Sequence, residues 1–271
     1  MKQLQMMFCK LNFLYRSIVS FITGNEFKPN ILHPQYLHTF FLKKYIFKAA
    51  KKYANGKLVD LGCGTKPYFY LIKEFIDSYL GIDLFNARKP VFFVDKDKKK
   101  PDIFADVKEI PLKDGFCDVV LCSQVIEHID NYKLLLNESN RILKKDGIII
   151  LTCPQTYPIH DKSNDFYRFT ANGLKYILKS SGFDVCECFR HGGFFVEQAL
   201  MVNIYLNNNL FLEGEGVNFK RIILSFFKII LMPLILMSNF LVNSVAFLLD
   251  KTDWDKYFTH NYTVVAKKNK L

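Results

Sequence analysis

A turn at residues 59–66 constrains the fold of this chain more than any other segment, because it joins a buried strand to a helix through glycines. The segment reads Val-Asp-Leu-Gly-Cys-Gly-Thr-Lys and follows a short apolar run, as expected of a parallel strand that is buried on both faces. Gly62 and Gly64 permit unusual backbone angles and the close approach of a ligand. Pro67 then suits the first turn of a helix.

An acidic residue ends the next strand-like run. Asp83 closes the run at 79–83 and follows Gly64 by 19 residues, which is the spacing at which doubly wound folds hydrogen-bond a ribose. The glycine turn and the carboxylate together indicate a pocket for a nucleotide-like ligand more strongly than either does alone.

Strand-like and helical runs alternate along the rest of the central region. Further strands are expected at 102–106, 116–123, 148–152, 183–189 and 262–267. Asn131 is expected to cap a helix that runs to Leu143 and is terminated by Gly147, and Thr170 to cap the next helix. This alternation predicts an α/β fold with a mostly parallel sheet covered on both faces.

The start of the chain has an amphipathic pattern. Apolar residues recur at helical spacing across 4–22, with Lys10 and Arg16 elsewhere on the wheel, which predicts either a helix packed over the domain or one that lies in a membrane interface. The two cations interrupt the apolar run, so we expect no secretory signal. A second helix is expected at about 35–53.

A long apolar run lies near the other end. The 21 residues at 229–249 carry no charge, which is long enough to span a bilayer. A proline and two asparagines weaken that interpretation, and the chain must return to the strand at 262–267. Two alternatives remain open: a buried helix pair or lid, and a patch that dips into the inner leaflet, which the nearby Lys220, Arg221 and Lys228 favour slightly.

These patterns divide the chain into four expected segments. They are N-terminal helices at 1–55, a ligand-binding core at 56–190, an apolar helical insertion or lid at 191–260, and the last strand of the core with the tail at 261–271.

The excess of basic residues does not point to nucleic acid. The formal net charge is +11, but only six of the 37 basic residues are arginines, the side chain that most often binds bases and phosphates. The lysines are scattered, without a basic stripe interleaved with aromatic residues. Anionic lipid headgroups are therefore the better-supported partner.

The seven cysteines form no Cys-x-x-Cys pair and predict buried thiols in a reducing cytosol. Cys186 and Cys188 would share one face of a strand, but two thiolates without a histidine make a poor zinc site. We therefore expect no metal, and a cytoplasmic protein that is either free or peripheral on the inner face of the membrane.

The motifs of the core, taken in order, resemble those of class I S-adenosylmethionine-dependent methyltransferases of the bacterial small-molecule type, with a methyltransferase type 11-like domain. The resemblance covers roughly 57–189 and the last strand. The motifs are Asp60-x-Gly62-x-Gly64, Asp83, Asp106, Ile110-Pro111-Leu112, Phe116-x-Asp118-Val119-Val120, Glu127-His128-Ile129 and Arg141-Ile142-Leu143-x-x-x-Gly147. The resemblance implies a Rossmann-like, doubly wound sheet of seven strands with an antiparallel last strand, and S-adenosylmethionine as the cofactor.

One position departs from the family pattern. The family often has a third glycine where this chain has Lys66, and we attribute that glycine to helix packing rather than to ligand approach. A plain Rossmann dehydrogenase has similar glycines and is the structural competitor. The Glu127-His128-Ile129 segment and an antiparallel last strand argue against it.

The resemblance also implies a set of cofactor-binding residues: Asp60, Gly62, Cys63, Gly64, Asp83, Leu84, Asp106, Val107, Ser123 and Gln124. Asp83 would accept both ribose hydroxyls, as a carboxylate with two oxygens can. Asp106 and the backbone after it would bind the adenine edge, and Asp60 would support the glycine turn or bind the ammonium of the cofactor through water. Ser123 and Gln124 would line the methyl-donor cleft or serve as turn residues.

The polar and aromatic loop that follows the fifth strand faces the substrate side. In it, His160 is a candidate general base, because imidazole titrates near neutral pH, and the alternative is a hydrogen-bonded structural group. Tyr167 and Arg168 would bind a substrate anion or sugar, or would hold the loop by pairing with Asp165. His128 lies near the same cleft, either as a substrate contact or in a structural role.

These features predict an enzyme that transfers a methyl group from S-adenosylmethionine, by in-line displacement, to a small-molecule acceptor such as a glycan or a lipid-linked intermediate. Holding two reactants at attack distance can supply about 7–11 kcal/mol of the barrier, so a shaped pocket is most of the mechanism. The first alternative is a catalytically silent fold that acts as a membrane or partner scaffold, although the intact acidic and glycine motifs argue against it. Nucleic-acid methylation is less favoured, because no Asn-Pro-Pro-Tyr-type motif follows the fourth strand.

Overall fold

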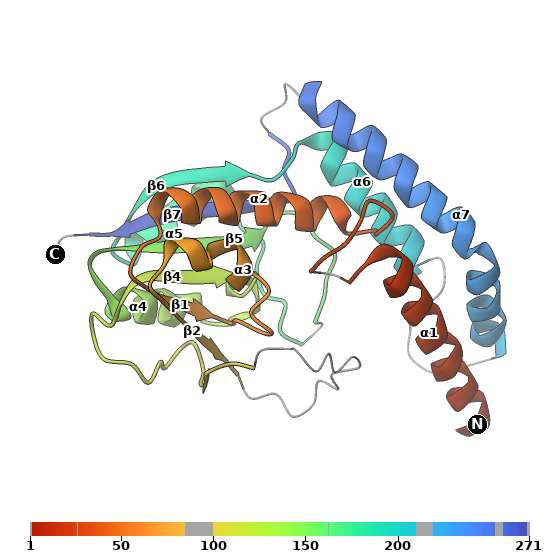
Figure 1. The fold of residues 1–271 in the computed structure, drawn as a ribbon, viewed down its shortest axis with the longest axis horizontal. Coiled ribbons are helices and arrows are strands. Elements are labelled where there is room, and N and C mark those ends of the chain that lie inside the picture. Colours follow the sequence, from red (N-terminus) through yellow and green to blue (C-terminus); the bar gives the residue numbers. More distant parts are fainter. Residues whose placement is uncertain are drawn as a thin grey trace. The chain divides into compact units, whose positions relative to one another are not determined.

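The computed structural model describes residues 2–25, 27–84, 100–161, 163–209, 219–252 and 257–269. They form two compact units (Figure 1). Residues 1–41 and 192–259 make up a helical unit, and residues 42–191 and 260–271 make up a sheet unit. The predicted N-terminal helices and the predicted insertion thus fall largely in one unit, except for most of the second helix. The lysine-rich segment expected after Asp83 lies outside the described residues.

Seven strands form one sheet in the sheet unit, in the order β3-β2-β1-β4-β5-β7-β6. Their bounds are β1 Lys57–Leu61, β2 Ser78–Asp83, β3 Ile103–Phe104, β4 Cys117–Ser123, β5 Leu143–Pro154, β6 Phe183–Arg190 and β7 Asn261–Lys268. Strands β1 to β5 pair in parallel, and β7 runs antiparallel to both β5 and β6. This confirms the predicted doubly wound, seven-stranded sheet with an antiparallel last strand.

Helices cover both faces of this sheet. They are α2 Tyr36–Tyr53, α3 Phe69–Ile72, α4 Tyr132–Ile142 and α5 Ala171–Ser180, with the short 3-10 turns η1 Lys73–Phe75 and η2 Ile126–His128. Neighbouring residues of a strand point to opposite faces. Leu121 therefore packs with Ile46 of α2, while Val120 packs in the core that contains Leu135 of α4 and Leu174 of α5.

The helix before β5 differs from its prediction at both ends. Asn131 occupies the N-cap position of α4, but its side chain makes no capping hydrogen bond. The helix ends at Ile142, because β5 begins immediately afterwards, and Gly147 lies inside β5. Asp146, with a φ of 64°, takes the left-handed conformation that was expected of the glycine.

Three further local predictions had different outcomes. Thr170 caps α5 as predicted, since its hydroxyl oxygen accepts a hydrogen bond from the Gly173 N–H at 3.1 Å. The third strand is shorter than predicted, at two residues. Pro67 precedes the helix that it was expected to begin, because α3 begins at Phe69.

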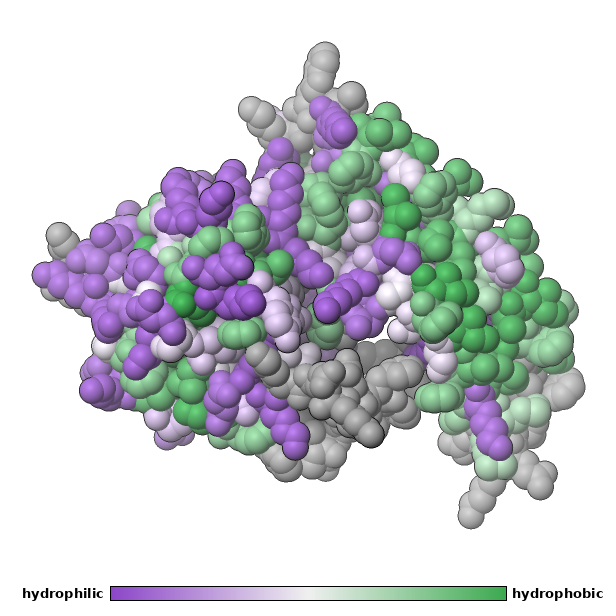
Figure 2. All heavy atoms as spheres, viewed as in Figure 1, coloured by the Kyte–Doolittle hydropathy of each residue, from purple (hydrophilic) through white to green (hydrophobic). Residues whose placement is uncertain are grey.

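The helical unit contains α1 Lys2–Thr23, α6 Phe194–Ile204, the π-turn η3 Tyr205–Asn209, α7 Phe219–Leu249 and the 3-10 turn η4 Asp250–Thr252. Within α7, residues Ser225–Leu249 have a mean hydropathy of 2.0, and only 28% of the most apolar part is buried. By length and composition alone this helix could cross a membrane. Figure 2 shows hydrophobic side chains gathered over α7, whereas hydrophilic side chains dominate the sheet unit.

Candidate functional site

The glycine turn folds over the carboxyl end of the neighbouring strand. The N–H groups of Gly62 and Cys63 both donate to the carbonyl oxygen of Ile82, at 2.8 and 3.1 Å. Gly62 and Gly64 have φ angles of 69° and 51°, the left-handed region that favours glycine. The backbone of the turn therefore favours glycine at both positions.

The two glycines differ in what surrounds them. A Cβ atom added at Gly62 would lie 2.3 Å from Cγ2 of Val125, whereas one at Gly64 would meet no atom within 4 Å. Gly62 is thus packed against the protein, and Gly64 borders open space. A ligand that approaches the backbone has room at Gly64.

Asp83 lies beside that space at the end of β2. One of its carboxylate oxygens accepts from the Gly64 N–H at 2.6 Å, and the other accepts from the Leu84 N–H at 2.7 Å. Each oxygen has a further lone pair, so the carboxylate is held in place and can still accept two hydroxyl groups. The residues present therefore fit the ribose of S-adenosylmethionine.

Lys66 shows why the family often has glycine at this position. Its φ is 58°, again the left-handed conformation. Its ammonium group is buried and lies 2.6 Å from Oδ1 of Asp102, and Oδ2 of Asp102 accepts from the Gly81 N–H at 2.7 Å. The left-handed backbone, rather than the helix packing inferred from the sequence, explains why glycine suits this position. In this chain the ion pair with Asp102 holds Lys66 there.

The other two acids of the motifs have different surroundings. Asp60 is 2% exposed and accepts a hydrogen bond from the hydroxyl of Tyr79, and burial raises its pKa to about 7. Asp106 lies in a turn after β3, where its Oδ1 accepts from the Lys108 N–H at 2.9 Å. Its side chain is 39% exposed, while the following Val107 is buried. Asp60 is placed to support the turn, and Asp106 is open to a ligand.

Ser123 and Gln124 belong to a hydrogen-bonded network at the carboxyl edge. The hydroxyl groups of Ser123 and Thr152 are 2.8 Å apart, and the Gln124 side-chain amide donates to Thr152 Oγ1 at 3.0 Å and accepts from Asn261 Nδ2 at 3.0 Å. The φ of Gln124 is 58°, as suits a turn residue. The network ties together the ends of β4, β5 and β7, and sequence analysis missed Thr152 and Asn261 because their partners depend on strand register.

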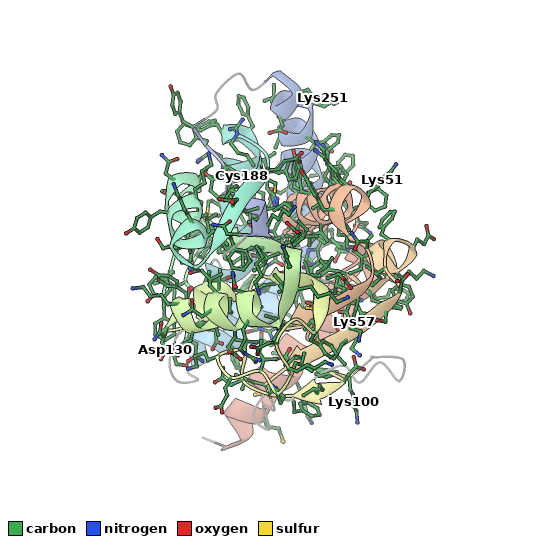
Figure 3. All side chains as sticks on the ribbon, turned by 90° about the vertical axis from the view of Figure 1, so that its left-hand side faces the viewer. Lys51, Lys57, Lys100, Asp130, Cys188 and Lys251 are labelled. Atoms are coloured by element: carbon green, nitrogen blue, oxygen red, sulfur yellow. The ribbon has the colours of Figure 1, made fainter. Side chains whose placement is uncertain are left out.

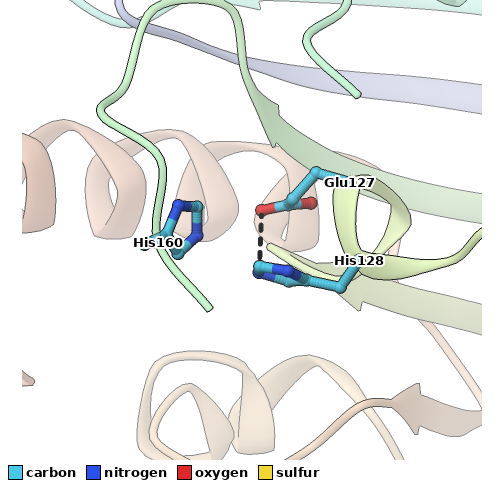
Figure 4. Close-up of side chains that lie close together, drawn as sticks. All are labelled: Glu127, His128 and His160. Atoms are coloured by element: carbon cyan, nitrogen blue, oxygen red, sulfur yellow. Dashed lines mark ion pairs between the residues drawn. The ribbon is translucent and has the colours of Figure 1, made fainter. Parts of the chain in front are cut away.

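A second group of side chains lies at the same edge of the sheet. Glu127, in η2, and His128, beside it, come together with His160 from the loop after β5 (Figure 4). Their potential ligand atoms all lie within 4.8 Å of one another, and the two imidazole rings meet edge to face with centroids 4.7 Å apart. Sequence analysis proposed both histidines but not the carboxylate between them.

The backbone contacts of the two histidines indicate their tautomers. Nδ1 of His128 is 2.9 Å from the carbonyl oxygen of Asn164, and Nδ1 of His160 is 3.2 Å from that of Pro158. A carbonyl oxygen only accepts, so in the neutral rings Nδ1 carries the hydrogen and Nε2 has the lone pair. Both rings are therefore oriented to accept a proton at Nε2.

Glu127 is a buried acid without a hydrogen bond. The side chain is fully buried, and neither carboxylate oxygen has a hydrogen-bond partner among the residues that the structure describes. Oε1 lies 3.9 Å from Nε2 of His128. Burial raises the pKa of Glu127 to about 8, so the carboxyl group is mainly protonated at neutral pH. Burial, followed by the neighbouring His128, lowers the pKa of His160.

The loop after β5 is held by its own side chains. Arg168 donates to both carboxylate oxygens of Asp165, at 2.5 and 2.7 Å, and also to the carbonyl oxygen of Tyr157. The hydrogen bonds of Arg168 lower the pKa of Asp165 to about 2. Tyr167 donates its hydroxyl to the carbonyl oxygen of Asp130 at 2.7 Å. Of the two alternatives for Tyr167 and Arg168, this geometry matches the one in which they hold the loop.

The two groups share one edge of the sheet. The glycine turn follows β1, Asp83 ends β2, Glu127 and His128 follow β4, and His160 follows β5, and these four strands are neighbours and parallel. Carboxyl ends of parallel strands meet at one edge, where open α/β sheets bind their ligands. The glycine turn with Asp83 and the cluster of Glu127, His128 and His160 are therefore carried by adjacent strands.

The donor atoms of the Glu127 cluster could also hold a metal ion, and the expectation of no metal, which rested on the cysteines, stays a prediction. Cys186 is exposed and Cys188 is half-buried. Figure 3 labels Cys188 on β6. Among the described residues neither belongs to a group of three potential ligands.

Comparison with known proteins supports a particular family. Residues 59–151 match the methyltransferase domain family. An uncharacterized protein of Methanocaldococcus jannaschii is 39% identical over 104 residues, which are 37% of this chain and 43% of that protein. The ubiquinone biosynthesis O-methyltransferase of Pelagibacter ubique is 26% identical and is matched over 73% of this chain and 81% of its own length. A probable S-adenosylmethionine-dependent methyltransferase of Mycolicibacterium smegmatis is 27% identical over 55% of this chain and 65% of its own length.

A solved structure shows the same fold. A chain in the complex of the Haloferax volcanii Trm112 methyltransferase activator with a methyltransferase superposes with a TM-score of 0.53, over 87% of this chain and 92% of its own length, at 14% identity. At that identity the likeness concerns the fold alone.

Proposed function

Because the chain belongs to the class I S-adenosylmethionine-dependent methyltransferase superfamily, we propose that it transfers a methyl group from S-adenosylmethionine to a hydroxyl group of a small-molecule acceptor. The observation that carries this proposal is the common edge on which Gly64 and Asp83 face the cofactor space and His160 offers Nε2 to an acceptor. The cofactor, when bound, supplies a methyl group on a positively charged sulfur.

The residues of this edge divide the chemistry between them. Asp83 and the backbone at Gly64 hold the cofactor. His160 would take the proton of the acceptor hydroxyl group at Nε2 when the acceptor oxygen receives the methyl group that the cofactor would supply. A general base of this kind contributes about 10²- to 10⁴-fold in rate. The lowered pKa of His160 keeps the ring neutral, and hence able to accept a proton, at neutral pH.

Glu127 assists in a second way. As the proton reaches the imidazole pair, positive charge develops next to the buried carboxyl group, which favours its ionised form. In molecules in which the carboxyl group is already ionised, it stabilises the imidazolium as an ion pair. Glu127 is therefore a positioning and charge-balancing residue in this proposal, and His160 is the base.

A lipid-linked acceptor is the better supported of the two acceptor classes that the sequence left open. The relative matched over most of its length is named as an O-methyltransferase of ubiquinone biosynthesis. The exposed apolar side chains of the helical unit suit a protein whose substrate resides in or near lipid. No observation favours the silent scaffold or nucleic-acid methylation.

The cofactor half of the proposal is tested by calorimetry with S-adenosylmethionine. We expect the wild type to bind and Asp83→Ala to lose at least tenfold in affinity, because the ribose hydroxyls lose their acceptor. Asp184→Ala, which removes an exposed carboxylate on β6, is the matched control and should bind as the wild type does. If the wild-type protein binds no cofactor, the proposal is wrong.

The acceptor half is tested by measuring how much methylated product forms with each of three acceptor classes. These are prenylated phenols, the same phenols without the prenyl chain, and sugars. We expect turnover with the prenylated phenols, a fall in kcat of about 10²- to 10⁴-fold for His160→Gln, and unchanged cofactor affinity in that variant. Turnover on sugars alone would contradict the acceptor class. Cofactor binding without turnover on any acceptor would favour the silent scaffold.

A further inference from the structure

The helical unit buries several polar side chains among its apolar ones, and it exposes a row of large apolar side chains. Its buried residues include Asn203, Asn207, Asn239 and Asn243. They bond to one another across the unit: the Asn203 amide donates to Asn243 Oδ1 at 2.9 Å, and the Asn207 amide donates to Asn239 Oδ1 at 3.0 Å. A helix pair in a water-soluble core normally has the reverse arrangement, with apolar residues facing inward.

The same asparagines attach α7 to a loop near the start of the chain. Nδ2 of Asn239 donates to the carbonyl oxygen of Leu32 at 3.0 Å, and Nδ2 of Asn243 donates to those of Ile31 and His33 at 2.7 and 3.0 Å. The two asparagines that weakened the sequence signal for a membrane helix therefore belong to one inward-facing side of it.

The opposite side of α7 is a continuous apolar stripe. Seven large apolar residues recur every three or four positions, and each is between 52% and 62% exposed: Phe226, Ile230, Leu234, Met237, Leu241, Val245 and Leu248. At 1.5 Å per residue the stripe is about 33 Å long. In α1, Phe13 and Phe21 are also exposed, by 53% and 92%. Exposed apolar surface of this extent marks an interaction site, and Figure 2 shows it over α7.

Charge on the helical unit indicates what covers this stripe. Lys10, Arg16, Lys28 and Lys251 are exposed. The acidic residues in the described part of the unit are Glu197, which is buried, and Asp250, which is half-buried and accepts from the Gly193 N–H. Exposed cations on a unit that also exposes an apolar stripe suit anionic phospholipid headgroups. A second copy of the chain would bring cations against cations.

We propose that the apolar stripe of α7, together with α1, docks on an anionic phospholipid bilayer and lies in its plane. Asn239 and Asn243 hold the inner side of α7 against the loop at Leu32 and Ile31. The hydrogen bond from the Gly193 N–H to Asp250 links the end of α7 to the start of α6. A crossing would break these polar contacts or pull them into hydrocarbon, where an unpaired polar group is strongly unfavourable. The chain after α7 also returns to β7, inside the sheet.

Vesicle co-sedimentation of the full chain tests the docking without reference to catalysis. Wild-type protein should sediment with vesicles of phosphatidylcholine and phosphatidylglycerol. Leu234→Glu and Leu241→Glu should each bind at least tenfold more weakly, because a charge must enter the headgroup–acyl boundary. Tyr176→Glu makes the same kind of change at a 73% exposed position on α5 and should bind as the wild type does.

Unchanged circular dichroism and cofactor affinity would show that the two variants are folded. Wild-type protein that stays in the supernatant at low salt, or stripe variants that bind like the wild type, would overturn the proposal. So would a dimer in lipid-free solution that Leu234→Glu dissociates, since the stripe would then be an interface between copies.

A labelling experiment separates docking from crossing. Two variants, Ile223→Cys and Lys251→Cys, are made in a Cys9→Ser, Cys186→Ser background and place a thiol near each end of α7. Each variant, bound to the outside of sealed vesicles, is treated with a membrane-impermeant maleimide. Docking in the plane predicts that both positions react from outside. Protection of one position until detergent is added would show a crossing and contradict the proposal.

Discussion

Glu127 is the residue whose chemistry depends most on its surroundings. Its pKa of about 8 in the folded protein compares with about 4.3 for an unperturbed glutamate. Between these values the folded state keeps a proton that the unfolded state has released, so stability falls as pH rises through this window. The cost reaches on the order of 5 kcal/mol above pH 8.

Glu127→Gln removes this titration, because glutamine has the same shape and no charge to bury. The melting temperature of the variant should therefore exceed that of the wild type by a margin that grows from pH 5 to pH 8 and then levels off. Glu109→Gln, at an exposed position, is the control. Its melting temperature should differ from that of the wild type by the same amount at each pH. A margin for Glu127→Gln that does not change with pH would contradict the raised pKa.

Gly62 and Gly64 have the same backbone region but different neighbours, and alanine substitutions should separate fold from ligand binding. Gly64→Ala should cost about 1–2 kcal/mol of stability through its φ and weaken cofactor binding at least tenfold, because the new Cβ fills the open space. Gly62→Ala should cost more, since its Cβ also overlaps Val125. Denaturant unfolding and calorimetry measure the two effects, and equal stability losses would contradict the difference in packing.

At the scale of elements, α7 has two sides with different roles, and the inward side concerns stability. Asn243→Leu removes the side-chain donor to the carbonyl oxygen of Ile31 and one of the two donors to that of His33, which keeps the Tyr36 N–H; this should cost about 1–3 kcal/mol. Asn172→Leu, the same change at an exposed position on α5, should stay within about 0.5 kcal/mol. Urea unfolding followed by circular dichroism compares the two, and similar losses would show that the Asn243 contacts contribute little.

The loop after β5 shows how an element is positioned by side chains rather than by regular structure. Arg168 and Asp165 close the loop on itself, and the N–H groups of Phe166 and Tyr167 both donate to the carbonyl oxygen of Glu127. His160 is thereby placed next to η2 although it lies on a different connection. The base in the proposed reaction thus depends on contacts that no local sequence pattern specifies.

At the scale of the whole molecule, the cysteines provide a test of the fold. All seven are free, with Cys9 and Cys186 exposed, Cys188 half-buried, and Cys63, Cys117, Cys122 and Cys153 buried. Brief treatment with N-ethylmaleimide should modify the two exposed thiols first. Intact-mass measurement should then show seven adducts after denaturation without reductant. Fewer than seven adducts would indicate a disulfide and contradict the predicted free thiols.

Local patterns in the sequence were enough to predict the architecture and, through the family resemblance, the cofactor. Strand and helix periods are properties of a few consecutive residues, and the glycine turn and Asp83 are placed by the strands that they terminate. Errors arose where two local preferences competed. Gly147 was expected to end a helix, but pairing with β4 and β7 extends the strand through it.

Only the tertiary structure decided three features of the molecule. They are the Glu127 cluster, the network of Gln124 with Asn261, and the inward side of α7. Gln124 and Asn261 are 137 positions apart, and Asn243 and Ile31 are 212 apart. Which side chains meet over such separations depends on strand register and on how helices pack, and neither can be derived from the period of one segment. The sequence by itself therefore determined the fold and the cofactor, because both follow from short motifs, while burial decided the ionisation of Glu127 and packing decided which side of α7 stays exposed.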